Sequence, residues 1–268
     1  MRNLYVTDLK RILKDKLFVV TCILAGVFAV VNPLLNKVIF EALDLGELLG
    51  NMVNAKSMLF SAFIPGDNLG LIMPILIAII VSKDFSQGTV RNKIISGRSR
   101  TEIFISHLLA SATVMCVLML LHALLTLGVS LCFFPYQATD FTAADLGYLM
   151  ASLAFEMLVY FAIAAIVTFI ATVAKNMGIC ILLYLAVSFG FSIVGAVLQV
   201  AGALLDPANK LYGVFEFLNA LNIYTSTLIG AGATYSVKQV LYILTAPIAI
   251  TAVSTILGVR LFARKNLK

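Results

Sequence analysis

Long apolar runs separated by short polar segments constrain the fold of this chain more than any other feature. Five runs are long enough to cross a bilayer, because a membrane helix needs about 20 mostly apolar residues. They are residues 17–39, 104–134, 146–174, 178–205 and 240–262. A sixth run, residues 69–82, is shorter and spans only if Lys83 reaches toward the headgroups. The pattern therefore predicts an all-α polytopic membrane protein with six transmembrane helices.

The composition excludes an ordinary soluble domain. Hydrophobic residues make up 61% of the chain and charged residues 12%, whereas soluble domains carry about 25% charged residues. The net charge of +6 would suggest nucleic acid as the partner of a soluble protein. Here the cations flank apolar runs, so we expect contact with membrane lipids and no nucleic-acid binding.

The distribution of charge orients the spans. With six spans, both ends of the chain, residues 83–102 and the turn at Lys175 fall on one side, which then holds fifteen of the nineteen cations. The positive-inside rule places that side in the cytoplasm. We therefore expect a multi-pass protein of a bacterial plasma membrane with cytoplasmic N- and C-termini. Residues 206–238 are expected to form an outer-surface or re-entrant segment, because Glu216, Asn219 and Asn222 make a poor span.

Residues 1–16 have the pattern of an amphipathic helix. Apolar side chains recur at helical spacing, and charged side chains occupy the remaining face. The apolar set is Leu4, Tyr5, Leu9, Ile12 and Leu13, and the charged set is Lys10, Arg11, Lys14 and Asp15. Such a helix lies in the membrane interface. It is expected to anchor the first span, and it is also a possible contact surface for a cytoplasmic subunit.

Residues 83–102 form a polar basic island in an otherwise apolar chain, with five cations and two acids. Asp84 or Ser86 is a candidate cap for a helix that starts near Gln87, and Gly97 is expected to end it. We predict a short helix between spans two and three that lies across the cytoplasmic surface.

The side chains of this short helix fall on two faces. Val90, Ile94 and Ile95 give an apolar side, and Arg91 and Lys93 are expected to be exposed. A helix held by two spans in this way is suited to transmit a push from a bound partner into both.

Few ionisable or helix-breaking residues lie within the spans. Glu156 is the only acid deep in a span, where an ionised carboxylate costs about 2.5–3.5 kcal/mol. It is either a substrate-pathway or proton-handling residue, or a protonated or paired residue in a helix contact. His122 is expected to be a hydrogen-bonded packing residue and His107 to be interfacial. Pro74 and Pro247 are candidate helix kinks.

The sequence offers no cofactor, metal or catalytic constellation of its own. The four cysteines form neither a CxxC nor a Cys/His cluster, so no metal site is expected. The nearest match to a phosphate-binding loop starts at Gly50 but has Ala55 in place of its second glycine. We therefore expect neither a bound nucleotide nor enzymatic activity in this chain.

The island carries a specific resemblance. An acid, a Gly-Thr pair, a short apolar stretch and Gly-Arg-Ser-Arg precede the next span, in the residues Asp84, Gly88, Thr89, Ile94, Ile95, Arg98 and Arg100. This pattern resembles the ABC-2-type permease subunits of ABC transporters, and the amphipathic N-terminus and six expected spans are similar to that family. The chain departs from the family at Asp84, where Glu is frequent, and at Gly97, where Pro is frequent.

The resemblance implies an exporter subunit. Residues 1–268 would form a single transmembrane permease domain that pairs with a second permease copy or paralogue and with two cytoplasmic ATPase subunits, which bind ATP and Mg. The island would be the coupling helix, and its ATPase contacts would be Asp84, Phe85, Gly88, Thr89, Val90, Arg91, Ile94, Arg98 and Arg100. The expected cargo is a hydrophobic or amphipathic compound such as a peptide or antibiotic.

Two other functions remain open on sequence grounds. One is an autonomous secondary transporter that is driven by protons and uses Glu156 as its proton site. The other is a membrane binding or immunity subunit that sequesters a toxin without transporting it. Transport on a proton gradient without an ATPase would favour the first function. Toxin binding without ATP-dependent efflux would favour the second.

Overall fold

All regular elements that the structure describes are helices, in agreement with the prediction from sequence. The structure is a computed structural model, and it describes residues 1–42, 54–65, 71–137, 141–205, 209, 211–224 and 237–265. In chain order its helices are α1 (Arg2–Lys14), α2 (Lys16–Ala42), α4 (Ala55–Phe63), α5 (Ile72–Ser86), α6 (Thr89–Ile95), α7 (Arg100–Ser130), α8 (Ala143–Val173), α9 (Met177–Leu204), α10 (Tyr212–Ala220) and α11 (Val237–Arg264).

Five of these helices are long and apolar enough to cross a membrane: α2, α7, α8, α9 and the Ile243–Arg264 part of α11. A sixth span results if Ile72–Phe85 of α5 and Thr89–Ile95 of α6 are counted together, although the two are bent by 55°. The chain is therefore a polytopic helical membrane protein with five or six candidate spans.

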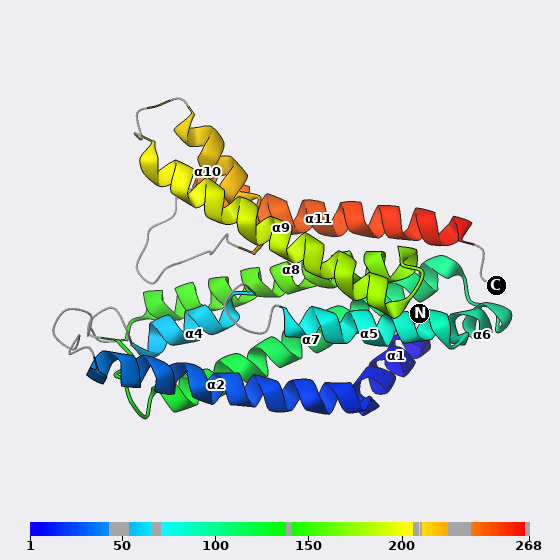
Figure 1. The fold of residues 1–268 in the computed structure, drawn as a ribbon, viewed down its shortest axis with the longest axis horizontal. Helices are drawn as coiled ribbons and strands as arrows, with labels where there is room; N and C mark the ends of the chain where they lie inside the picture. Colours follow the sequence, from blue (N-terminus) through cyan, green and yellow to red (C-terminus); the bar gives the residue numbers. More distant parts are fainter. Residues whose placement is uncertain are drawn as a thin grey trace.

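Helices α4 and α5 follow one another along the long axis of the molecule (Figure 1). Helix α5 alone has 15 residues and is about 22 Å long, which is less than the roughly 30 Å of a hydrocarbon core. Helix α4 ends where Ile64 adopts an extended conformation, as expected for the residue before Pro65. Together α4 and α5 cover the length that α5 alone does not.

Helix α1, the last turn of α11 and α6 lie at the same end of the bundle (Figure 1). We call this the terminal end and the opposite one the distal end. The Arg100 guanidinium ties the start of α7 to the end of α11. Its Nη1 donates to the carbonyl oxygens of Phe262 (2.8 Å), Ala263 (3.0 Å) and Lys265 (2.6 Å). These bonds satisfy carbonyls that a helix end leaves without partners.

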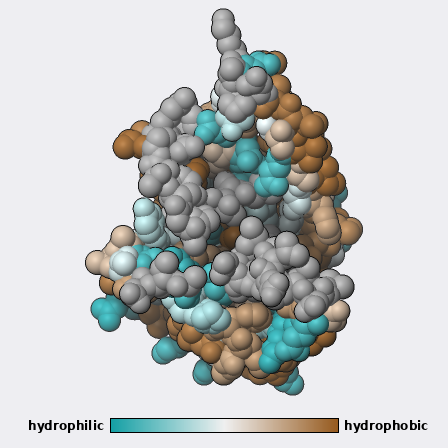
Figure 2. Space-filling view, turned by 90° about the vertical axis from the view of Figure 1, so that its left-hand side faces the viewer, coloured by the Kyte–Doolittle hydropathy of each residue, from teal (hydrophilic) through white to brown (hydrophobic). Residues whose placement is uncertain are grey.

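The core of the bundle is built around α7 and α8. The whole stretch of α8 from Ala162 to Val167 is buried, and its alanines allow neighbouring helices to approach closely. Helices α2 and α9 expose long apolar faces, which include Val38 and Leu204. The space-filling view of the distal end also shows broad apolar flanks (Figure 2). Apolar flanks of this kind are compatible with surrounding lipid.

The three prolines within helices behave differently. Helix α11 continues through Pro247, and α2 continues through Pro33, which the sequence reading did not single out. Pro74 lies in the first turn of α5. A proline in the first turn of a helix removes no helical hydrogen bond, and the kink at Pro74 stays a prediction.

Helices α7 and α11 meet at Gly258. A methyl group at this position would lie 2.4 Å from the ring of Phe104, which is itself buried. Only a residue without a side chain fits this contact.

We predict that Gly258→Ala destabilises the protein. The added carbon must displace the Phe104 ring, and overpacking of this kind costs about 1–3 kcal/mol. The measurement is the midpoint of thermal unfolding in detergent. The matched control is Gly190→Ala in α9, where a Cβ meets nothing within 4 Å, and it is expected to be neutral or slightly stabilising. Equal midpoints for the two variants would contradict the proposed contact.

Candidate functional site

A buried ion cluster lies at the terminal end of the bundle. It contains Asp8 and Arg11 from α1, Asp84 from α5, Lys93 from α6 and His107 from α7. Asp8, Asp84 and His107 are 1%, 2% and 3% exposed. The cluster therefore joins four helices that are separate in the sequence.

Lys93 lies at the centre of this cluster. Its Nζ donates to Asp8 Oδ1 (2.5 Å) and is 3.6 Å from Asp84 Oδ2. It is also 3.0 Å from His107 Nε2. An ammonium group has no acceptor, so Nε2 is the accepting, unprotonated nitrogen of the imidazole. The prediction that Lys93 is exposed is wrong, because its side chain is 12% exposed and its head reaches the acids beneath α6.

Asp84 pairs with the Arg11 guanidinium, and its Oδ2 lies 3.3 Å from His107 Nε2. The prediction that Asp84 or Ser86 caps the short helix is wrong. Helix α5 continues through both residues to Ser86, and the cap of α6 is Gly88 in the left-handed conformation with φ 71°. Neutralisation by Arg11 and Lys93 allows α5 to carry Asp84 in its buried last turn.

The burial of Asp8 and of His107 was not predicted from the sequence. Leu4, Asp8 and Ile12 are the buried residues of α1. Their i, i+4, i+8 spacing puts Asp8 on the apolar face, and that spacing was the available signal. Ser106 completes the arrangement by donating to Asp8 Oδ2 (2.6 Å).

The charges of the cluster balance with a neutral imidazole. Two carboxylates face one ammonium and one guanidinium, which is the condition under which buried charge is tolerated. Burial by itself raises the pKa of Asp8. The hydrogen bonds from Lys93 and Ser106 and the positive charge of Lys93 oppose this effect, and the pKa of Asp8 lies below its ordinary value.

The same residues have the donor set of a metal site. Ligand atoms of Asp8, Asp84 and His107 all lie within 4.8 Å of one another. However, Lys93 Nζ lies between them and, together with Arg11, already compensates both carboxylates. A divalent ion added to this set would leave excess buried positive charge. The arrangement therefore fits an internal ammonium better than a metal.

A further ion pair ties α5 to the junction of α1 and α2. Lys83 Nζ lies 3.1 Å from Asp15 Oδ2, and the Leu17 amide donates to Asp15 Oδ1 at 3.0 Å. Burial raises the pKa of Asp15, but the two hydrogen bonds and the charge of Lys83 together outweigh it and lower the pKa below its ordinary value. Two residues at the start of the island, Lys83 and Asp84, therefore pair with the N-terminal residues Asp15 and Arg11.

Helix α6 presents one face to solvent. Val90 is buried, whereas Ile95 is 74% exposed. We define the exposed face of α6 as Arg91, Asn92, Ile95 and Ser96. An isoleucine this exposed on a short, fixed helix is suited to contact a partner.

The structure places the nine residues predicted to contact an ATPase in different environments. Arg91 is exposed, Asp84 and Val90 are buried, and the others are partly buried. Phe85 packs edge-on against the Phe262 ring with centroids 5.6 Å apart. Phe85 and Arg100 therefore both hold the end of α11.

Glu156 and His122 are buried within the described spans. Glu156 in α8 is 2% exposed. His122 Nδ1 is 3.0 Å from the Ala25 carbonyl oxygen, which confirms that this histidine is a hydrogen-bonded packing residue. His107 lies near the start of α7, at the end of the span where it was expected, and its ring is buried among α1, α5 and α6.

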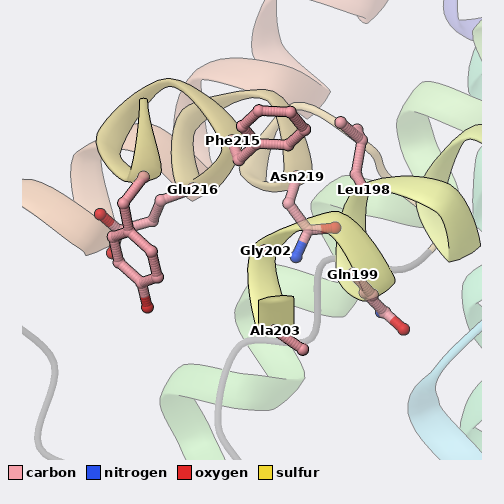
Figure 3. Close-up of a pocket in the computed structure, with 8 residues that line it drawn as sticks. Leu198, Gln199, Gly202, Ala203, Phe215, Glu216 and Asn219 are labelled. Carbon is pink, nitrogen blue, oxygen red and sulfur yellow. The ribbon is translucent and has the colours of Figure 1, made fainter. Parts of the chain in front are cut away.

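Helix α10 folds back along α9 at the distal end (Figure 1). Asn222 Nδ2 donates to the Phe191 carbonyl (2.6 Å), and the hydroxyls of Tyr224 and Tyr184 are 3.1 Å apart. A cleft of about 280 Å³ lies between the two helices. Phe215, Glu216 and Asn219 of α10 and Gly202 and Ala203 of α9 line it (Figure 3).

Comparison with known proteins gives one family. The sequence model of a family described as protein of unknown function (DUF2705) matches residues 18–267. No curated protein matches the chain.

We predict that Asp84→Leu destabilises the protein by up to about 3–5 kcal/mol, because it removes a buried carboxylate from the partly buried Arg11 guanidinium and from the largely buried Lys93 ammonium. The readout is the yield and thermal midpoint of the purified protein. The control is Glu41→Gln, which removes an exposed pair with Lys37 and is expected to change stability by less than about 1 kcal/mol. A neutral Asp84→Leu variant would contradict the cluster.

We also predict that the contribution of Asp8 to stability is lost in acid. Because its pKa is lowered in the folded state, the stabilisation is fully present above the unfolded value of about 3.9 and disappears as the pH falls through the folded value. The thermal midpoints of wild type and Asp8→Asn should differ at pH 6 and converge below pH ~4. A constant difference down to the lowest pH at which the protein stays soluble would argue against this.

Proposed function

The chain belongs to this family of unknown function, DUF2705, and we propose that it is the membrane-spanning permease subunit of an ATP-driven ABC exporter. Separate cytoplasmic ATPase subunits would bind ATP and Mg, and a second permease copy or paralogue would complete the transporter. In this proposal the terminal end of the bundle faces the cytoplasm of a bacterial cell.

The observation that carries this proposal is the exposed face of α6. Ile95 is 74% exposed on a seven-residue helix, although a simple surface turn needs no apolar side chain there. Lys93 on the opposite face of the same helix is bound into the ion cluster. Helix α6 thus combines a rigid attachment to the bundle with an apolar contact surface, as a coupling helix requires.

The attachment also supports a route for coupling. A displacement of α6 would act on α1 through the Lys93–Asp8 pair and on α7 through His107. It would act on α5 through the two residues that connect the helices, Gln87 and Gly88. Arg100 extends the route from α7 to the end of α11. Closure of an ATPase pair against α6 would then move several membrane helices together.

The exposed apolar flanks support the assignment of cargo. A hydrophobic or amphipathic compound, such as a peptide or antibiotic, would enter from the bilayer and leave between two permease copies. Helices α2 and α9 have the most exposed apolar faces of the described spans, so they are the natural surfaces for a second copy and for lipid.

Photo-crosslinking in cells tests the ATPase contact. The photoreactive residue p-benzoylphenylalanine is placed at Ile95, and the crosslinked products are identified by mass spectrometry. We expect a nucleotide-binding ATPase subunit among them. The control position is Val197, which is 61% exposed on α9 and should give no ATPase adduct. Crosslinks from position 95 to lipid alone would reject the proposed partner.

A substitution on the same face provides the functional arm. Ile95→Glu should abolish co-purification of the ATPase found by crosslinking, because a charge cannot be desolvated in an apolar contact. Ile95→Leu should retain co-purification. Since Ile95 is exposed, neither change should alter the thermal midpoint, and this separates loss of contact from loss of fold.

The buried Glu156 favours a second candidate function, an autonomous proton-coupled transporter. Its carboxyl group is 2% exposed within a membrane span, and acids at such positions commonly handle protons or substrate. Purified protein in liposomes without any ATPase would then move substrate on a proton gradient, and Glu156→Gln would abolish the movement. Under the ABC proposal this preparation is inactive until an ATPase and ATP are added.

A further inference from the structure

The cleft between α9 and α10 differs in polarity from the apolar flanks of the bundle. Its volume of about 280 Å³ is slightly below the roughly 300–1,000 Å³ of sites that enclose a whole small molecule. Its lining includes one carboxylate, two side-chain amides and two aromatic rings, which belong to Glu216, Gln199, Asn219, Tyr212 and Phe215 (Figure 3). The cleft therefore has the size and the polarity to hold one polar group of a larger ligand.

The cleft lies at the edge of the membrane-spanning part of α9. The residues of α9 that line it fall between Leu198 and Ala203, about 32–39 Å along the helix axis from its start at Met177. A hydrocarbon core is about 30 Å thick. Gln199 is exposed, and Glu216 is partly buried. A ligand can therefore place a polar group in the cleft while its apolar chain remains in the bilayer beside α9.

The charge of the cleft favours a cation. Among the described residues that line it, Glu216 is the only charged one. The segments that join the distal ends of consecutive spans, residues 37–71, 135–145 and 206–238, contain eight acids and four cations. A surface with an excess of one charge attracts ligands of the opposite charge. An anionic head group would meet like charge here, whereas an ammonium group would meet an opposite charge.

The lining suits an ammonium group better than a metal ion. A protein-bound metal ion is usually held by several carboxylate or histidine ligands, and the described lining has one such residue, Glu216. The Gln199 amide oxygen and the Tyr212 hydroxyl are further acceptors for an ammonium group, and aromatic rings attract cations to their faces. Glu216 also has a contact within the chain. A carboxylate accepts about four hydrogen bonds, so this contact leaves room for a ligand.

We propose that the cleft between α9 and α10 binds the primary ammonium group of a cationic amphiphile, such as an amphipathic peptide with a free amine. The Glu216 carboxylate accepts hydrogen bonds from the ammonium group, and the apolar part of the ligand lies in the bilayer along α9. Phosphatidylethanolamine also carries an ammonium group, but its adjacent phosphate finds no cation in the described lining. The role of the ligand as cargo rests on the exporter function proposed above, whereas its binding does not.

Photolabelling of the purified chain in phosphatidylcholine nanodiscs tests the site without an ATPase. Four diazirine probes are compared: a long-chain primary amine, the alcohol and the carboxylate of the same chain length, and a phosphatidylethanolamine with the diazirine in one acyl chain. Mass spectrometry measures the labelling of peptides from the cleft and from α2. We expect saturable labelling of the cleft by the amine, at a concentration about tenfold lower than for the alcohol, which is the effect of one charge-assisted hydrogen bond.

A charge substitution tests the contact with the ligand. Glu216→Gln keeps the shape of the side chain, and it should weaken amine binding by about tenfold without changing alcohol binding. The matched control is Glu41→Gln at the distal end of α2, where the carboxylate side chain is 68% exposed. This control removes the same charge from the same end of the bundle and should leave amine binding unchanged. The pair separates a contact in the cleft from a general attraction by the surface.

A steric substitution locates the site. Gly202 lines the cleft, and a Cβ at this position meets nothing within 4 Å, so Gly202→Leu places its side chain in open space. It should abolish saturable labelling. The control is Gly190→Leu on the same helix, where a Cβ also meets nothing within 4 Å, and it should not affect labelling. Leucine is a better helix former than glycine, so both variants should keep the thermal midpoint of the wild type.

Three results would overturn the proposal. They are amine labelling of the cleft that does not saturate, equal labelling of the cleft by the phosphatidylethanolamine probe, and a Glu216→Gln variant that binds the amine like the wild type. Saturable amine binding together with failure of the ATPase crosslink would leave the ligand site intact and reject the exporter function alone.

Discussion

The Lys93 ammonium between Asp8 and Asp84 is the interaction on which the terminal end of the bundle depends. An apolar solvent on the flanks of the protein gives helices little reason to associate through hydrophobic burial alone. Buried opposite charges supply an orientation-dependent attraction instead. Because the partners come from α1, α5 and α6, one ammonium fixes the relative position of three helices, and His107 and Ser106 add α7 to the set.

Most of the fold could be predicted from the sequence, because membrane helices are recognised by the length and apolar composition of a run of residues, and both can be read directly from the sequence. The five long runs correspond to α2, α7, α8, α9 and α11. The second predicted span, residues 69–82, was harder because it is short, and α4 precedes it on the other side of Pro65. The sequence reading did not foresee that a separate buried helix would complete the length of α5.

The candidate site was only partly predictable. The island between α5 and α7 was located correctly, since it is a strong contrast of composition. Arg91 is exposed and Val90 is buried as predicted, but Lys93 was assigned to the wrong face because charged residues were expected to point to water. Lys93 and Asp84 instead neutralise each other within the protein. The pair between Asp8 and Lys93 joins residues far apart in the sequence. Its only local sequence signal is the position of Asp8 on the apolar face of α1.

The contacts of Lys265 have a consequence for the order of assembly in the membrane. Its ammonium donates to the Thr172 carbonyl oxygen (2.6 Å) and lies 3.3 Å from that of Ala174. These carbonyls close the end of α8, and α8 is complete almost a hundred residues before Lys265 is synthesised. During insertion that end of α8 must be hydrated or held by other groups. The end of α8 therefore obtains these hydrogen bonds only after the last turn of α11 has folded. A truncation of α11 before Lys265 would leave the Thr172 and Ala174 carbonyl groups without this donor.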